Sequence, residues 1–136
     1  MNDASGNRAL ADRITIETRA WIDGEAVPTR SGKTFATLNP ATGAPLAEVA
    51  ACDHTDVDVA VKAARRAFDD GAWSRCDPHE RKETLLRFAA LLRQHGEELA
   101  LLESLDSGKT IRDCRNEVAH EVPHFFQWYA ETIDKS

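Results

Sequence analysis

Residues Ser107–Thr110 read Ser-Gly-Lys-Thr, which is how the phosphate-binding loop of many nucleotide-binding proteins ends, and Ser31–Thr34 repeat the same four letters. Such a loop also needs a glycine five positions before its second glycine, because the chain must curl there to direct its amides at the phosphates. Glu103 and Val27 occupy those positions. The carboxylate of Glu103 would repel a phosphate, and the Glu- and Leu-rich stretch Glu97–Leu105 indicates a helix where a buried strand is required. Both stretches are therefore interpreted as turns.

The second stretch with the spacing of a chemical site is His120-Glu121-Val122-Pro123-His124, which matches the zinc-binding helix of many metalloproteases. There, two histidines one turn apart hold the metal and the glutamate activates water. Pro123 would disturb that turn, because proline lacks the amide hydrogen and clashes with the carbonyl four residues back, at Ala119. We therefore interpret His120 and His124 as solvent-facing residues near a helix start, and keep a zinc hydrolase as a third hypothesis.

The three cysteines, Cys52, Cys76 and Cys114, form neither a C-x-x-C pattern nor an even set for disulfides. This usage favours a reducing cytoplasm with structural thiols. Cys76 follows Arg75, whose charge could activate the thiol mildly, although a loop cysteine beside one arginine is usually inert. The sequence has no G-x-S-x-G for a serine hydrolase and no G-x-G-x-x-G for a dinucleotide loop.

Composition excludes several classes of function. The 136 residues suffice for one domain, and the formal net charge of -6 argues against a nucleic-acid or anionic-membrane partner. No apolar run approaches the roughly 20 residues of a membrane span, and the first residues lack the apolar core of a signal peptide.

The elements that would position these residues fall into three parts. Residues 1–13 are expected to form a flexible tail, residues 14–52 short β-strands and hairpins, and residues 53–136 a helical part. Asp23-Gly24 between apolar residues predicts a tight hairpin turn. Asn39-Pro40 predicts the end of a strand, because proline cannot continue the ladder.

The helical part carries several start and stop signals. Thr55 with Asp58 predicts a capping box, and Gly71 a helix end. Asp77-Pro78 predicts the start of a second helix, which Gly96 interrupts. The expected apolar stripes are Val57, Ala60, Val61, Ala64 and Phe68 on the first helix, Leu85, Phe88, Ala89 and Leu92 on the second, and Val122, Phe126, Tyr129 and Ile133 on the last.

About four amphipathic helices thus follow a few short strands, with no later strands to form a central sheet. The last helix also gathers Phe125, Phe126, Trp128 and Tyr129, and such a surface normally packs against something. The chain is therefore expected to be the front end of a larger protein.

Five ordered blocks of sequence carry a resemblance to a known family. They are WIDGEAV, SGKTFATLNPATGAPLAEVA, DVDVAVKAARRAFDDGAW, ERKETLLRFAALLRQHGEELALLESLDSGKTIRD and WYAETIDK. In order and spacing they resemble the N-terminal part of the NAD(P)-dependent aldehyde dehydrogenases. DSGKTIRD and WYAETIDK resemble most closely the branch that oxidises gamma-glutamyl-gamma-aminobutyraldehyde.

The resemblance implies an α+β fragment of an α/β enzyme, in which short N-terminal β-hairpins precede about four helices of the coenzyme domain. It implies a homo-oligomeric parent enzyme that oxidises a small aldehyde with NAD or NADP. In the family a cysteine thiolate attacks the aldehyde, hydride passes to the nicotinamide, and a glutamate activates water to hydrolyse the thioester. None of the three cysteines matches the nucleophile motif, so this chain is expected neither to bind coenzyme nor to act alone.

The resemblance also implies a structural monovalent cation, held in the family by ligands that resemble the backbone carbonyls of Thr37 and Leu38 and the carboxylate of Asp106. Oxygen ligands of this kind suit a hard cation. The alternative is that Asp106 only caps its helix or faces solvent. A second hypothesis for the whole chain is a non-catalytic interaction module that binds a partner through its apolar helix face.

Overall fold

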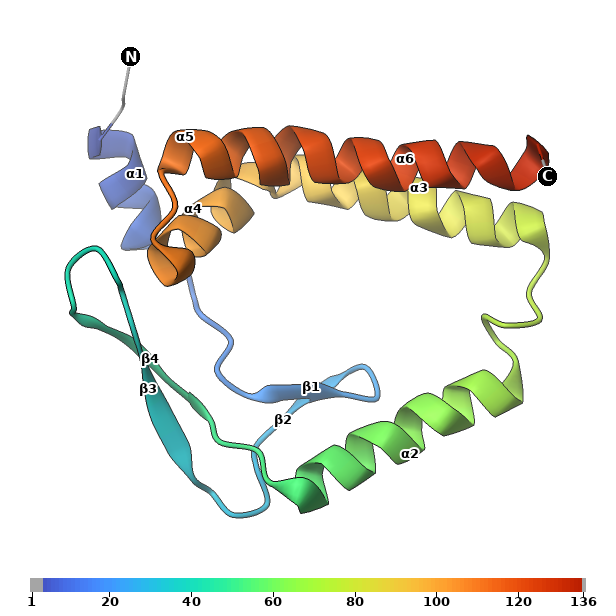
Figure 1. The fold of residues 1–136 in the computed structure, drawn as a ribbon, viewed down its shortest axis with the longest axis horizontal. Helices are drawn as coiled ribbons and strands as arrows, with labels where there is room; N and C mark the ends of the chain where they lie inside the picture. The colour runs from blue at the N-terminus through green and yellow to red at the C-terminus, as the bar shows by residue number, and fades with distance from the viewer. Residues whose placement is uncertain (1–3, 136) are drawn as a thin grey trace. The chain divides into compact units, whose positions relative to one another are not determined.

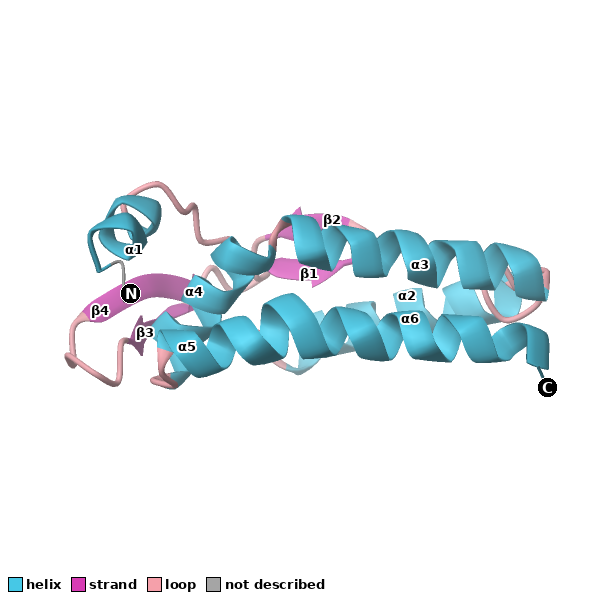
Figure 2. Cartoon of the chain, turned by 90° about the horizontal axis from the view of Figure 1, so that it is seen from above, coloured by secondary structure: helices cyan, strands magenta, loops and turns pink. Residues whose placement is uncertain are grey.

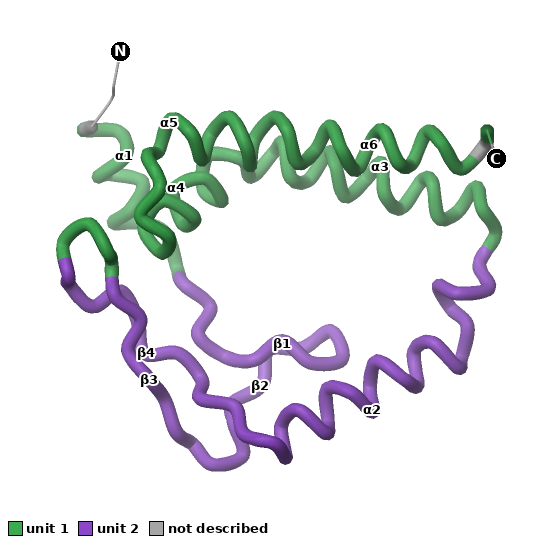
Figure 3. The backbone as a smooth tube through the Cα atoms, in the orientation of Figure 1, with its two compact units in different colours: residues 1–15, 39–42, 77–136 green, residues 16–38, 43–76 purple. Residues whose placement is uncertain are grey.

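The computed structural model describes residues 4–135, which form two compact units (Figures 1 and 3). One unit, purple in Figure 3, contains residues 16–38 and 43–76 and is called the hairpin unit. The other, green in Figure 3, is called the helical unit; its described residues are 4–15, 39–42 and 77–135.

The hairpin unit begins with strands β1 (Ala20–Ile22) and β2 (Glu25–Val27), which pair in antiparallel fashion. Asp23 and Gly24 connect them with φ values of 56° and 81°. Both turn residues therefore adopt the left-handed conformation that a two-residue hairpin requires. The predicted turn is confirmed.

Strands β3 (Thr34–Leu38) and β4 (Pro45–Ala50) form the second antiparallel pair, with Phe35 opposite Val49. The register shifts between Thr37 and Leu38, which marks a β-bulge. Strand β3 ends directly before Asn39-Pro40, as predicted.

Helix α2 (His54–Asp70) follows, and its capping box lies two residues earlier than predicted. The carboxylate of Asp53 accepts a hydrogen bond from the Thr55 amide at 2.8 Å, and that of Asp56 accepts one from the Asp53 amide at 3.1 Å. The prediction of Thr55 with Asp58 was wrong because Asp53 itself is the first residue able to cap. Gly71 ends the helix with a φ of 80°, as predicted.

The buried face of α2 also differs from the predicted apolar stripe. Asp56 and Ala63 are its buried residues, whereas Val61 is 61% exposed and Phe68 is 60% exposed. The helix turns toward β1 with the face that carries Asp56, because that carboxylate also accepts a hydrogen bond from the Arg30 amide at 3.0 Å. Much of the apolar stripe is therefore on the surface.

The helical unit starts with α1 (Ala4–Ala11), a helix in the stretch that was expected to be a loose tail. Alanine and leucine favour helix, and Arg115 Nη2 donates to Asn7 Oδ1 at 2.7 Å. A hydrogen bond from a residue distant in the sequence thus stabilises this helix. Residues 1–3 lie outside the described part of the chain.

Helix α3 (Pro78–Gln94) begins at the predicted Asp77 cap, and α4 (Gly96–Ser107) follows after a single residue. Gly96 marks the break because a Cβ there would lie 2.7 Å from the Cβ of Ala119. Only glycine allows the two backbones to approach this closely.

The last helix is one continuous rod made of α5 (Ile111–Cys114), a π-helix (Arg115–Glu121), α6 (Val122–Thr132) and a 3-10 turn (Ile133–Lys135). The helix was predicted to start near His120 because of Pro123, but it starts at Ile111. The widened π-helical turn before Pro123 allows the chain to continue through the proline.

Helices α3 and α6 lie side by side and antiparallel (Figures 1 and 2). The rings of Phe88 and Phe126 meet edge to face, with centroids 4.8 Å apart. Ala89 and Ala130 are buried, whereas Tyr129, which was predicted on the buried stripe, is 61% exposed. The small residues occupy the positions nearest the partner helix because a larger ring would hold the helices apart.

No helix among residues 4–135 is both long enough and apolar enough to cross a membrane.

Candidate functional site

The Ser-Gly-Lys-Thr stretch at residues 107–110 is a helix end. Gly108 has a φ of 77° and ends α4, so the interpretation of this stretch as a turn is confirmed. Ser107 Oγ donates to the Glu103 carbonyl and Ser104 Oγ to the Lys109 carbonyl, both at 2.7 Å. The first hydroxyl therefore bonds back within α4, and the second joins the last turn of α4 to the residue after Gly108.

Lys109 of the same stretch is held by carboxylates. Its Nζ lies 2.6 Å from Glu117 Oε2 and 3.9 Å from Glu103 Oε1. The hydrogen bond to Glu117 raises the pKa of Lys109 above its usual range. Thr110 Oγ1 accepts a hydrogen bond from the Asp113 amide and so caps α5. Lysine and threonine, which would bind phosphate and Mg²⁺ in a nucleotide loop, serve as structural partners here.

The second occurrence, at residues 31–34, is the turn between β2 and β3. Gly32 has a φ of 68°, and the Lys33 amide donates to Ser31 Oγ at 3.2 Å. The Lys33 carbonyl accepts a hydrogen bond from the Ala51 amide at 2.9 Å. This stretch joins the start of β3 to the end of β4.

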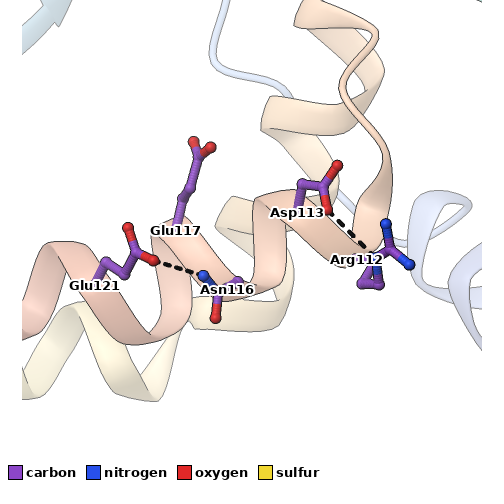
Figure 4. Close-up of a pocket in the computed structure, with 5 residues that line it drawn as sticks. All are labelled: Arg112, Asp113, Asn116, Glu117 and Glu121. Carbon is purple, nitrogen blue, oxygen red and sulfur yellow. Dashed lines mark hydrogen bonds and ion pairs between the residues drawn. The ribbon is translucent and has the colours of Figure 1, made fainter.

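A polar surface pocket of about 400 Å³ lies along the start of the last helix (Figure 4). Its lining residues are Arg112, Asp113, Asn116, Glu117 and Glu121. Asn116 Nδ2 donates to Glu121 Oε1 at 2.6 Å, and Arg112 Nε lies 3.3 Å from Asp113 Oδ1. Figure 4 draws both contacts as dashed lines.

Three carboxylates and one guanidinium give this pocket its electrostatics. Hydrogen bonds from Thr110 and Arg112 lower the pKa of Asp113, so that carboxylate is ionised at neutral pH. Glu117 accepts the ion pair from Lys109. The pocket could attract a cation or a hydrogen-bond donor, but each of its acids already contacts a side chain of the protein itself. Its lining contains no thiol, hydroxyl or imidazole that could act as a nucleophile.

His120 lies in the π-helix and His124 in α6, and both are exposed. Pro123 between them is almost fully buried. Among the described residues, no three His, Cys, Asp or Glu side chains come together in an arrangement that could hold a metal ion. The histidine spacing therefore has no third ligand within the described chain.

The three cysteines have different surroundings. Cys52 is exposed, and Cys76 is half-buried with its thiol donating to the Trp73 carbonyl at 3.1 Å. Cys114 is completely buried, and that burial raises the pKa of its thiol. A thiol with a raised pKa is a poor nucleophile, so Cys114 is a structural residue.

Arg75, whose charge was considered as an activator of the Cys76 thiol, is bound elsewhere. Arg75 Nη2 donates to the Asp69 carbonyl at 2.5 Å, and its guanidinium lies against Gly71. The arginine therefore closes the end of α2, which is a structural use of its charge.

The residues proposed for a cation are divided between the units. Thr37 and Leu38 lie on β3, opposite the bulge of β4, in the hairpin unit, and Asp106 lies in the last turn of α4 in the helical unit. The ligand set stays a prediction.

A family model described as the aldehyde dehydrogenase family matches residues 27–136. The chain is 52% identical over 127 residues to aminoacetaldehyde dehydrogenase of Pseudomonas aeruginosa, covering 93% of this chain and 26% of that protein. It is 43% identical over 122 residues to the NADP/NAD-dependent aldehyde dehydrogenase PuuC of Escherichia coli, covering 90% and 25%. The chain belongs to the aldehyde dehydrogenase family.

Solved structures of aldehyde dehydrogenases also superpose closely on this chain. The gamma-glutamyl-gamma-aminobutyraldehyde dehydrogenase of Burkholderia cenocepacia superposes with a TM-score of 0.93 at 45% identity, over 97% of this chain and 27% of that one. An indole-3-acetaldehyde dehydrogenase of P. syringae, solved with NAD+, gives a TM-score of 0.92 at 46% identity over the same share. This chain thus spans about a quarter of the length of these relatives.

Sequence reasoning missed the polar pocket. Its residues fall at steps of one, three, one and four from residue 112 to residue 121, a spacing that follows one side of a helix. The pattern could have been recognised if the helix had been started at Ile111. The pattern was missed because Pro123 was expected to disturb the helical turn, with His120 and His124 near a helix start.

Proposed function

We propose that this chain is the N-terminal part of an NAD(P)-dependent aldehyde dehydrogenase that oxidises a small aldehyde to a carboxylate. The observation that carries the proposal is the superposition of 97% of the chain on a solved aldehyde dehydrogenase with a TM-score of 0.93. The names of that protein and of the 52% identical relative favour an aminoaldehyde as the substrate.

The role of these residues in such an enzyme is structural. Large apolar side chains are exposed in both units: Trp21, Phe35, Leu38, Val57, Val61, Phe68 and Trp73 in the hairpin unit, and Phe88, Leu91, Phe125, Trp128 and Tyr129 in the helical unit. Burying one such side chain fully contributes about 1.5–3 kcal/mol. The remainder of the enzyme would cover these residues, and the isolated chain is expected to be only marginally stable.

The coenzyme would accept the hydride from the substrate when it is bound by the whole enzyme. The described residues fit no coenzyme site of their own, because both Ser-Gly-Lys-Thr stretches are occupied by turn and capping contacts. What they would supply is the scaffold, with α3 and α6 packed as a rigid pair.

A chimera tests the proposal. The matching segment of the P. aeruginosa aminoacetaldehyde dehydrogenase would be replaced by residues 14–136, and NAD reduction measured with a panel of aminoaldehydes. We expect the chimera to keep its activity, because nearly all of the chain superposes on this fold. A chimera that folds and assembles like the parent but oxidises no aldehyde would refute the proposal.

The 136-residue chain by itself is the matched negative control. We expect no NAD-dependent aldehyde oxidation, because none of its cysteines matches the family nucleophile and Cys114 is buried. Turnover that disappears when Cys52, Cys76 or Cys114 is replaced by serine would contradict this expectation.

Three finer features belong to the same proposal. The enzyme is expected to be a cytoplasmic homo-oligomer with a monovalent cation bound by the carbonyls of Thr37 and Leu38 and the carboxylate of Asp106. In the chimera, the melting temperature should then depend on the choice of Na⁺, K⁺ or Li⁺, and Asp106→Asn should reduce that dependence. Equal melting temperatures in all three salts would exclude the cation.

The second candidate function is a non-catalytic interaction module. The exposed apolar residues on α2, including Val61 and Phe68, favour it. If this function is correct, the purified chain should be a stable monomer with a sharp thermal transition, and its binding to a partner should be lost in Phe68→Ser.

A further inference from the structure

Along the last helix, the positions of the buried residues do not fit an uninterrupted α-helix. Cys114, Pro123 and Ala130 are all almost completely buried within the helical unit. Pro123 is nine positions after Cys114, and at about 100° per position an α-helix would place them on opposite faces, about 180° apart. Ala130 is seven positions after Pro123, which places it within about 20° of the same face as Pro123.

A single additional residue between Cys114 and Pro123 explains the difference. Removing one residue from that interval would bring the two side chains to about 80° from one another in an α-helix. The π-helix Arg115–Glu121 lies in this interval, and the Val122 amide donates to the Glu117 carbonyl, five residues back. A π-helical turn of this kind acts as a one-residue insertion in an α-helix.

Pro123 supplies the reason for the insertion. In an α-helix its ring would collide with the Ala119 carbonyl, and it has no amide hydrogen to donate to that carbonyl. The wide turn moves the carbonyl away from the ring. Proline at this position therefore disfavours the α-helical alternative rather than ending the helix.

Contacts with α4 also stabilise the π-helical turn, in addition to Pro123. Ala119 lies against Gly96, and Arg115 Nη2 is 2.7 Å from Glu97 Oε2. Both contacts join the π-helix to the first two residues of α4. A return to the α-helical register would rotate the preceding part of the helix by about 100° and break them.

We infer that Pro123 is a positioning residue that locks a one-residue register insertion into the last helix, and that this insertion keeps Cys114 in the same core as Ala130. The inference concerns contacts within the helical unit and is independent of the proposed enzymatic function.

The thiol of Cys114 provides the test. In the 136-residue chain with Cys52→Ser and Cys76→Ser, the rate of reaction with an aromatic disulfide reagent would report the exposure of Cys114 alone. We expect slow reaction in this background and reaction at least about tenfold faster with Pro123→Ala, because the helix can then return to the α-helical register. His120→Ala, which keeps the chain length, serves as the control and should react slowly.

A compensating deletion separates register from simple loss of stability. Deleting the exposed His120 while keeping Pro123 should expose Cys114, because proline would then lie in an α-helical turn. Deleting His120 together with Pro123→Ala should restore slow reaction, because the inserted residue and its cause are removed together. The inference is overturned if Pro123→Ala alone leaves Cys114 protected, or if the combined variant reacts as fast as either single change.

Discussion

Gly96 at the start of α4 faces Ala119 of the π-helix so closely that an added Cβ would lie 2.7 Å from the Ala119 Cβ and 3.1 Å from its Cα. Alanine favours helix over glycine by about 1 kcal/mol. Overpacking costs about 1–3 kcal/mol. Gly96→Ala is therefore expected to lower the free energy of unfolding by about 1 kcal/mol, measured by urea denaturation.

The matched control for that prediction is Ala119→Gly. In the double variant the Cβ is moved from one helix to the other, so part of the stability lost in Gly96→Ala should return. If the two changes add without any compensation, the close approach of these residues does not exist in solution.

The capping box of α2 predicts unequal effects for its two acids. Asp53→Ala removes the acceptor of the Thr55 amide and should cost about 1 kcal/mol. Asp56→Ala should cost more, because it leaves the amides of both Asp53 and Arg30 without their acceptor at a site that is 5% exposed. Thermal denaturation of both variants would show which one loses more stability, and Asp58→Ala, at an exposed position, serves as the control.

Glu17 should titrate at unusually low pH. Its carboxylate accepts hydrogen bonds from Arg19 Nε at 2.8 Å and Nη2 at 2.7 Å, which lower the pKa of Glu17 from 4.5 to about 2. A lowered pKa means that the pair stabilises the fold above about pH 4.5 and that this contribution is lost as the pH falls toward 2. Because both groups are exposed, the contribution is small.

Carbon-detected NMR titration would measure that pKa directly. Arg19→Ala should return the pKa of Glu17 toward 4.5. Arg13→Ala removes the same positive charge outside the pair and should leave the pKa of Glu17 low. An ordinary pKa in the unmodified chain would show that the pair does not form.

Substitutions on the exposed apolar stripe of α2 should affect stability differently from substitutions on its buried face. Val61→Ser should change the stability of the 136-residue chain by less than about 0.5 kcal/mol, because the side chain is on the surface. The same change in the chimera with the P. aeruginosa enzyme should lower the melting temperature, if the rest of the enzyme covers this stripe. Ala63→Ser, at a buried position, should destabilise both proteins.

Local signals were read correctly wherever a single backbone conformation decides the outcome. Asp23-Gly24 form the turn between β1 and β2, Gly71 ends α2, and Gly108 lies in the turn after α4, with both of these glycines in the left-handed conformation. Asp77-Pro78 begin α3. The family resemblance was also correct, because ordered blocks of sequence preserve many such local decisions together.

Apart from the capping box of α2, which was placed two residues too late, predictions failed where residues outside the local pattern decide the outcome. Helix α1 is held in part by the hydrogen bond from Arg115, and α2 turns its Asp56 side inward because the Arg30 amide needs that acceptor. The start of the last helix was misplaced because the sequence pattern gave no sign of the π-helical turn that accommodates Pro123.

The amino-acid sequence by itself thus determined the turns, the end of α2 at Gly71, the start of α3 at Asp77 and the family of this protein, since each depends on a few adjacent residues. Which face of a helix is buried was decided only by the tertiary structure. That choice depends on what each face packs against: Gly96 leaves room for Ala119, and the π-helical register brings Cys114 into the core.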